Sequence, residues 1–205
     1  MKYVIWDWNG TLFDDLDLCL YCINRLLYNN GYKTLPTMEA YKKVFGFPIK
    51  DYYKRAGFDF SKKPYTELAH EYMDMYLPMA KFAPLNKDAV SALEAFKAKG
   101  YKQYILSATE LSNLKAQVSM FPIDKYFDGL LGIENVYAAS KARLAHNFLE
   151  EHSDIEEIIF IGDTYHDLEV AKILNAKTFL YNGGHQIIEP KENYTVINSL
   201  KELYL

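Results

Sequence analysis

Cysteine is scarce in this sequence, and it has neither a long apolar run nor an excess of positive charge. Only two cysteines occur, Cys19 and Cys22. No second cysteine pair or close histidine completes the four ligands of a structural zinc site. Both lie within a helical pattern of apolar residues that starts at Leu16. We therefore interpret them as buried thiols on one face of a helix rather than as a redox or metal pair.

The charge balance gives no sign of a polyanionic partner. Lys and Arg total 23 against 27 Asp and Glu, a formal net charge of -4, and the basic residues are scattered among acidic ones. Without a basic stripe, we expect no nucleic-acid partner. No apolar run approaches the roughly 20 residues that span a bilayer, and the strand pattern begins at Tyr3 without a leader and cleavage site. We expect a cytoplasmic protein with no membrane contact.

An apolar run near the N-terminus ends in a single carboxylate. Tyr3 to Trp8 read as a strand in which Tyr3 to Ile5 are packed below Asp7, and a glycine turn follows. Ligand sites in open α/β sheets lie just beyond the carboxyl ends of parallel strands, so Asp7 would stand in a crevice. The alternative is that Asp7 and Asn9 only close an Asx-type turn.

The next part of the chain, residues 14–82, predicts helices without strands. Apolar residues recur at helical spacing in four segments, 16–28, 38–45, 52–56 and 65–79, which glycines and prolines separate. The segment is rich in tyrosine, and tyrosines at helical spacing are more often core and rim packing than a substrate-stacking surface.

From residue 83 onward, strands and helices alternate. The predicted strands are 102–106, 129–133, 157–161, 177–181 and 194–197, and the predicted helices are 87–99, 111–120, 141–151 and 168–174. This alternation favours a parallel sheet with right-handed crossovers. Asp7, Ser107 and Asp163 then each end a strand at the same edge of the sheet, where their side chains can converge.

Five residues carry a resemblance that spans the whole chain. In order and at fitting spacing, the sequence resembles the four motifs of the haloacid-dehalogenase-like hydrolase superfamily through Asp7, Ser107, Lys141, Asp163 and Asp167. It is most similar to the phosphoglycolate-phosphatase-like branch. The resemblance implies a Rossmann-like parallel sheet core with helices on both faces, residues 1–13 and 83–205, and an inserted all-helical cap domain, residues 14–82.

The resemblance also implies a chemistry, that of a Mg²⁺-dependent phosphatase acting on a small phosphorylated metabolite, in a monomer or homodimer. Asp7 would attack phosphorus and form an aspartyl-phosphate. A carboxylate is repelled by phosphate unless a cation lies between them, and Mg²⁺ favours oxygen ligands. The implied metal ligands are Asp7, the backbone carbonyl of Asn9, Asp163, and Asp167 directly or through water. The implied substrate-binding residues are Asn9, Gly10, Thr11, Ser107, Lys141 and, in the contact loop at residues 45–50 of the cap, Lys50.

Each of these residues also has a simpler interpretation. Ser107 could cap the helix predicted at residue 111, and Lys141 could be a solvated lysine. Asp163 and Asp167 could only cap a helix and complement its dipole. A glycine before Asp163, at the end of an apolar strand, favours metal binding instead.

Asn9 departs from the family pattern, which has Asp two residues after the nucleophile. That Asp protonates the leaving group, and an amide cannot. The substrate could be an acyl phosphate or phosphoanhydride that needs little protonation, or His166 or His185 could substitute, although the simpler interpretation of each is an exposed loop residue. The chain could instead be a slow or non-catalytic phosphate-ester binding protein. A haloacid dehalogenase also lacks the second Asp but needs no metal, so the Asp163 and Asp167 pair counts against it. A phosphonate hydrolase would need a cap lysine, which nothing singles out.

Overall fold

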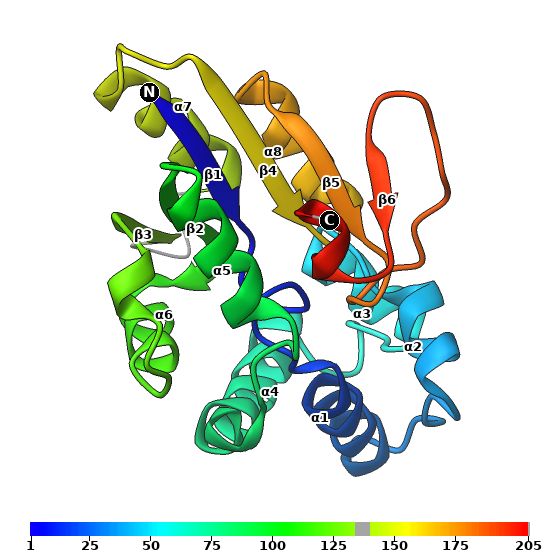
Figure 1. The fold of residues 1–205 in the computed structure, drawn as a ribbon. Helices are drawn as coiled ribbons and strands as arrows, with labels where there is room; N and C mark the ends of the chain where they lie inside the picture. The colour runs from blue at the N-terminus through cyan, green and yellow to red at the C-terminus, as the bar shows by residue number, and fades with distance from the viewer. Residues whose placement is uncertain (134–139, 205) are drawn as a thin grey trace.

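The computed structural model describes residues 1–133 and 140–204, which form an α/β fold around one parallel six-stranded sheet (Figure 1). The strand order is β3-β2-β1-β4-β5-β6, and all five pairings are parallel. The strands are β1 Lys2–Trp6, β2 Lys102–Glu110, β3 Gly129–Ile133, β4 Glu157–Gly162, β5 Lys177–Tyr181 and β6 Thr195–Ile197. This confirms the predicted Rossmann-like parallel sheet.

The helices connect the strands and fill the long segment after β1. The α-helices are α1 Leu16–Asn29, α2 Met38–Val44, α3 Ile49–Ala56, α4 Tyr65–Met79, α5 Ala89–Ala98, α6 Leu111–Val118, α7 Lys141–Glu151 and α8 Tyr165–Ile173. The short 3-10 helices are η1 Ala80–Phe82, η2 Asp124–Tyr126 and η3 Leu200–Leu203.

Both faces of the central strand are covered, as the continuous apolar run of β1 predicts. Val4 and Trp6 face the core that contains α5, where the ring of Trp6 meets that of Phe96 edge-on at 5.5 Å between centroids. Tyr3 and Ile5 face the opposite core, with residues of α7 and α8. Alternate side chains of one strand therefore serve two cores.

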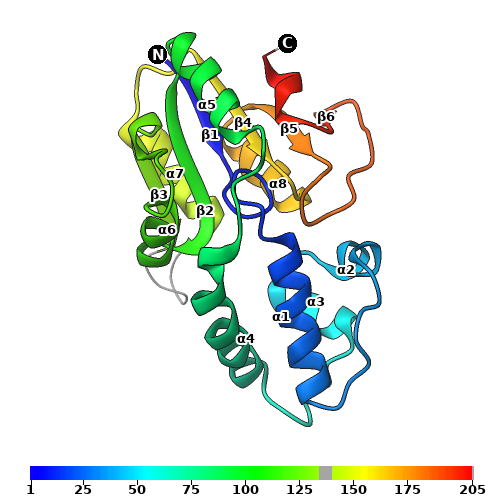
Figure 2. The same cartoon turned by 60° about the horizontal axis from the view of Figure 1, so that its bottom comes forward.

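Helices α1 to α4 lie together beyond the carboxyl ends of the strands, as both views show (Figures 1 and 2). Residues 14–82 are all described and contain no strand. Four of the segment's tyrosines are buried, Tyr41, Tyr52, Tyr53 and Tyr76, in accord with the packing interpretation. The domain boundaries near residues 13 and 82 remain a prediction. No helix in the described residues has the length and apolar character needed to cross a membrane.

Several elements differ in extent from the sequence prediction. Strand β2 continues past Ser107 to Glu110, with an irregular register against β3 between Leu106 and Glu110. Helix α8 begins at Tyr165, three residues earlier than predicted, because Thr164 caps it. Apolar spacing misses such starts, since the first turn of a helix is often polar. The thiols of α1 are free and buried, as expected.

Candidate active site

Three carboxylates from two adjacent strand ends meet at one edge of the sheet. Asp7 directly follows β1, and its backbone N–H donates to the Ile161 carbonyl of β4 at 2.8 Å. Asp163 directly follows β4, and Asp167 lies in the first turn of α8. Carboxylate oxygens of the three residues lie within 4.8 Å of one another, and all three side chains are buried. The convergence expected from the strand ends is therefore present.

Asp167 both caps a helix and faces the site. Its Oδ2 accepts from the backbone N–H of Asp163 at 3.1 Å and from Thr164 N–H and Oγ1 at 2.9 and 2.7 Å, completing a capping box. A Cβ at Gly162 would collide with the Asp167 carboxylate, so glycine is needed before Asp163. The capping interpretation is thus right for Asp167, but its other oxygen remains directed at Lys141.

Lys141 is a buried ammonium between two of these carboxylates. It opens α7 directly after the Ser140 cap and is 3% exposed. Its Nζ donates to Asp7 Oδ1 at 2.5 Å and to Asp167. Burial alone would lower the Lys141 pKa, but Asp167 and Asp7 outweigh burial and raise it. The solvated-lysine interpretation is wrong.

The cluster carries more negative charge than Lys141 can neutralise. Burial, with repulsion from Asp167, raises the pKa of Asp7 well above its ordinary value despite Lys141. Burial also raises the pKa of Asp163 to about 6, whereas Lys141 overcomes burial and lowers that of Asp167. Three buried carboxylates with an all-oxygen donor set suit a hard divalent cation such as Mg²⁺. The donor set therefore fits the metal that the resemblance implies.

The turn after β1 packs closely against this acidic cluster. Gly10 has φ +74°, and a Cβ there would collide with the Asp163 carboxylate and the His185 ring. The Gly10 N–H donates to Phe13 O at 2.8 Å and to Asp15 Oδ1 at 3.1 Å, so it is already engaged. Thr11 Oγ1 donates to Asp163 Oδ1 at 3.3 Å.

Ser107 lies at the same edge of the sheet as Asp7. Strands β1 and β2 pair Trp6 with Ile105, so Ser107 stands just past the end of β1. Its buried hydroxyl accepts from the Thr109 N–H at 3.1 Å. Helix α6 has Glu110 at its N-cap without a side-chain bond, so Ser107 does not cap that helix.

The predicted contact loop reaches the site through its aromatic residues. Phe45 stacks on His185 and Phe47 on His166, with ring centroids 4.7 and 4.4 Å apart. Lys50 instead lies with its Nζ 5.9 Å from the centroid of the Phe60 ring and is not gathered with the acidic cluster. Burial lowers the pKa of His166.

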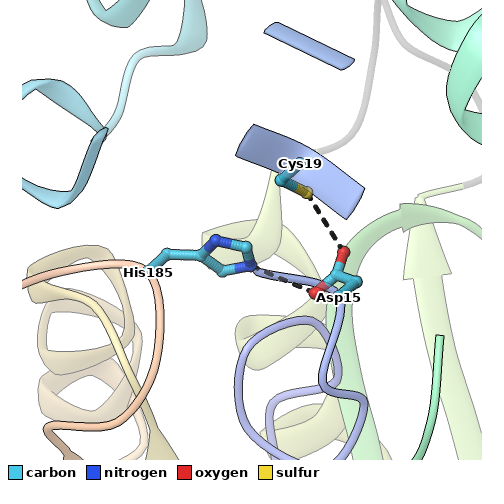
Figure 3. A group of neighbouring side chains, drawn as sticks. All are labelled: Asp15, Cys19 and His185. Atoms are coloured by element: carbon cyan, nitrogen blue, oxygen red, sulfur yellow. Dashed lines mark hydrogen bonds and ion pairs between the residues drawn. The ribbon is translucent and has the colours of Figure 1, made fainter. Parts of the chain in front are cut away.

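Asp15, Cys19 and His185 form a second buried cluster (Figure 3). Sequence reasoning named His185 as a candidate beside the site but missed its burial and its contact with Asp15. His185 Nε2 faces Asp15 Oδ1 at 3.2 Å, and its Nδ1 faces the Tyr41 hydroxyl at 2.8 Å. Its backbone N–H donates to Asp163 at 2.5 Å. Burial would lower the His185 pKa, but Asp15 overrides burial and raises it to about 9. The imidazolium therefore pairs with Asp15.

This second cluster also offers metal-donor atoms. Asp15, Cys19 and His185 bring an oxygen, a sulfur and a nitrogen within 4.8 Å of one another, a set that suits Zn²⁺ better than Mg²⁺. Cys19 Sγ lies 3.4 Å from Asp15 Oδ2. Because Asp15 and His185 already have hydrogen-bond partners, the cluster is satisfied without an ion.

Asn9 turns its side chain towards the second cluster. Its Nδ2 donates to Asp15 Oδ2 at 2.8 Å and to the Tyr76 hydroxyl at 2.9 Å. Its Oδ1 accepts from Thr109 Oγ1 at 2.7 Å. The only signal for this contact in the sequence was an acid, Asp15, a few residues after the turn. Such an acid is too common to predict a contact.

Comparisons with known proteins agree on one family. The protein-family model described as "Haloacid dehalogenase-like hydrolase" matches residues 4–181 of this chain. A protein of Caldanaerobacter subterraneus subsp. tengcongensis, provisionally named pyrophosphatase PpaX, is 24% identical over 180 residues, which cover 82% of this chain and 76% of that protein.

Solved structures share the fold. A predicted phosphatase from Clostridium acetobutylicum has a TM-score of 0.81 at 22% identity, covering 99% of this chain and 96% of that one. A predicted phosphoglycolate phosphatase from Haemophilus somnus has a TM-score of 0.77 at 17% identity, with the same coverage. At these identities the likeness establishes the fold alone.

Proposed function

This chain belongs to the haloacid dehalogenase-like hydrolase family, and from that membership we propose that it is a Mg²⁺-dependent phosphatase. Its substrate is a small phosphorylated metabolite, and turnover passes through an aspartyl-phosphate on Asp7. The observation that carries the proposal is the buried group of three carboxylates whose charge Lys141 only partly neutralises. Such a group is costly to bury unless a cation joins it.

Asp7 is the nucleophile in this proposal. One of its oxygens forms a bond to phosphorus while the bond from phosphorus to the leaving oxygen breaks, and water then cleaves the aspartyl-phosphate. Lys141, which touches Asp7 and Asp167, holds the nucleophile in place and offsets the charge of the phosphate. The hydroxyls of Thr11 and Ser107 would donate hydrogen bonds to the phosphate oxygens.

The metal ligands in this proposal are the Asp7 carboxylate, the Asn9 backbone carbonyl and Asp163, with Asp167 acting directly or through water. When bound, Mg²⁺ supplies charge neutralisation between Asp7 and the phosphate. The close packing of Gly10 against Asp163 keeps that carboxylate at the turn. The helical segment, residues 14–82, then serves as a cap that excludes water.

The organic part of the substrate would meet the contact loop at residues 45–50. Phe45 and Phe47 already stack on His185 and His166, which follow β5 and β4. The relatives' names point to different substrates, pyrophosphate and phosphoglycolate, so neither is carried over to this chain.

A second candidate follows from Asn9, which cannot transfer a proton. The chain would then be a slow phosphatase or a non-catalytic protein that binds a phosphate ester and retains the metal site. Phosphoryl transfer to Asp7 needs no proton from Asn9 when the leaving group is good, so we favour the enzyme.

A screen of metabolite phosphates, with and without Mg²⁺, tests the proposal. The Asp7→Asn variant removes the nucleophile, and Asp17→Asn is the matched control, because it makes the same change at an exposed residue of α1. We expect Mg²⁺-dependent phosphate release by the wild type and by Asp17→Asn but not by Asp7→Asn. Absence of metal-dependent turnover above the Asp7→Asn level on every substrate would leave the binding protein as the answer.

A further inference from the structure

We propose that Asp15 fixes residue 9 as an amide, so that of these two facing side chains the carboxylate stands at position 15 and not, as in the family pattern, at position 9. Asn9 and Asp15 then form an exchangeable pair in which one member carries the charge and the other does not. The structural claim is independent of activity, and only its catalytic consequence rests on the proposed function.

The hydrogen bonds of Asp15 show why the amide is required. Oδ2 accepts from the Tyr76 hydroxyl at 2.6 Å and from Asn9 Nδ2 at 2.8 Å. Oδ1 accepts from the Gly10 N–H at 3.1 Å and faces His185 Nε2, and Figure 3 draws the contact with His185. An ionised carboxylate can only accept hydrogen bonds. The atom of residue 9 that faces Asp15 must therefore be a donor, which Asn supplies and ionised Asp cannot.

An aspartate at position 9 would face Asp15 directly. The two carboxylate oxygens would stand where 2.8 Å now separates Asn9 Nδ2 from Asp15 Oδ2, and Asp15 is only 1% exposed. Tyr76 has one hydroxyl proton to give, and it already goes to Asp15. Two buried like charges at hydrogen-bond distance cannot both stay ionised without cost.

Exchanging the two residues restores the hydrogen bonds. With Asp at position 9 and Asn at position 15, the new amide can donate to residue 9, and the Thr109 hydroxyl can still donate to residue 9. The oxygen of the new amide can accept from the Gly10 N–H and from His185. The total charge is unchanged, but His185 loses its ionised partner. We therefore expect the exchange to lower the stability of the protein only slightly.

The consequence for catalysis is a substrate class. A loop that keeps an amide at position 9 cannot protonate the leaving oxygen from there, which favours substrates whose leaving group departs as an anion. Acyl phosphates and phosphoanhydrides have such leaving groups, and simple alkyl phosphates do not. We infer that the enzyme acts on the former class.

The pairing is tested by thermal unfolding without Mg²⁺ of the wild type, Asn9→Asp, Asp15→Asn and the double variant. Asn9→Asp should lower the midpoint by roughly 10 °C, the usual effect of an uncompensated buried charge in a chain of this size. The double variant should recover most of that loss. The matched control combines Asn9→Asp with Asp14→Asn, which removes the same charge from an exposed neighbour, and it should recover nothing.

Two outcomes would overturn the pairing: an Asn9→Asp variant as stable as the wild type, or a double variant no more stable than Asn9→Asp. The catalytic consequence is read from the ratio of turnover on an alkyl phosphate to turnover on acetyl phosphate. This ratio should rise about a hundredfold in the double variant, the low end of general acid–base catalysis, and an unchanged ratio would refute the substrate class. If the wild type shows no turnover at all, the proposed function fails while the unfolding data still decide the pairing.

Discussion

Asp7→Asn should stabilise the metal-free protein although it removes the nucleophile. Burial and the neighbouring acids raise the pKa of Asp7 well above its ordinary value, so the folded state binds a proton more tightly than the unfolded state does. The charged form of Asp7 therefore costs stability, and the cost grows as pH rises above the ordinary pKa of 3.8. At neutral pH, removing the charge should return about 1 kcal/mol, within the usual range for such changes.

The same substitution at Asp167 should have the opposite sign. Lys141 lowers the Asp167 pKa despite burial, so the charge of Asp167 stabilises the folded state at neutral pH and is lost as pH falls. Asp167→Asn weakens a charged hydrogen bond to Lys141 and a helix cap. Together these should cost about 3 kcal/mol.

Thermal unfolding at neutral pH, with chelator and then with Mg²⁺, measures both effects. In chelator, the Asp7→Asn midpoint should rise by roughly 2–4 °C and the Asp167→Asn midpoint should fall by roughly 6–12 °C. Saturating Mg²⁺ should reverse the order of the wild type and Asp7→Asn, because ligand at 100 times its dissociation constant adds about 2.7 kcal/mol only where the site is intact. An Asp7→Asn variant less stable than the wild type in chelator would refute the reasoning.

Three further predictions concern the turn and the titrating groups. Gly10→Ala and Gly31→Ala both place alanine at a positive φ, which costs about 1–2 kcal/mol of folding stability in each variant. Only Gly10→Ala should abolish stabilisation by Mg²⁺, because its Cβ displaces Asp163. Thermal unfolding with and without Mg²⁺ measures this, and loss of the stabilisation in both variants or in neither would contradict it. The His185 pKa is raised from 6.5 to about 9, so the contribution of its ion pair to folding stability is complete below pH 6.5 and is lost as pH rises through about 9. The unfolding midpoint of the wild type should therefore fall over that pH range, and His185→Gln should flatten the fall. An unchanged slope in the variant would count against the ion pair. Because the Asp163 pKa is about 6, protons compete with Mg²⁺ there, and the midpoint gain from Mg²⁺ should shrink as pH falls through that value; a constant gain would exclude Asp163 as a ligand.

The strand ends could be predicted because they depend on local pattern. An apolar run followed by Asp7, and another followed by Gly162 and Asp163, predict two buried strands of a parallel sheet, and parallel strands end at a common edge. That topology brings the acids together whatever the details of packing. The start of α7 at Lys141 was likewise visible from helical spacing, although its burial between Asp7 and Asp167 was not.

Spacing along the chain could not predict which individual side chains of the helical segment meet the core. Asp15 and His185 are 170 positions apart, and no spacing rule relates a residue before α1 to one after β5. For Lys50, which was expected in a contact loop, the structure shows the first turn of α3, with the ammonium over the Phe60 ring; its role in substrate binding stays a prediction.

The sequence by itself determined the sheet, the acidic edge and the family, since each follows from periodicity and from short motifs that local chemistry dictates. Only the tertiary structure showed which side chain faces Asn9. Its neighbour Asp15 comes close because the turn at Gly10 folds back and the helical segment packs onto the sheet. Whether a side chain there must be an acid or an amide depends on the charge that faces it, and that charge is set by packing.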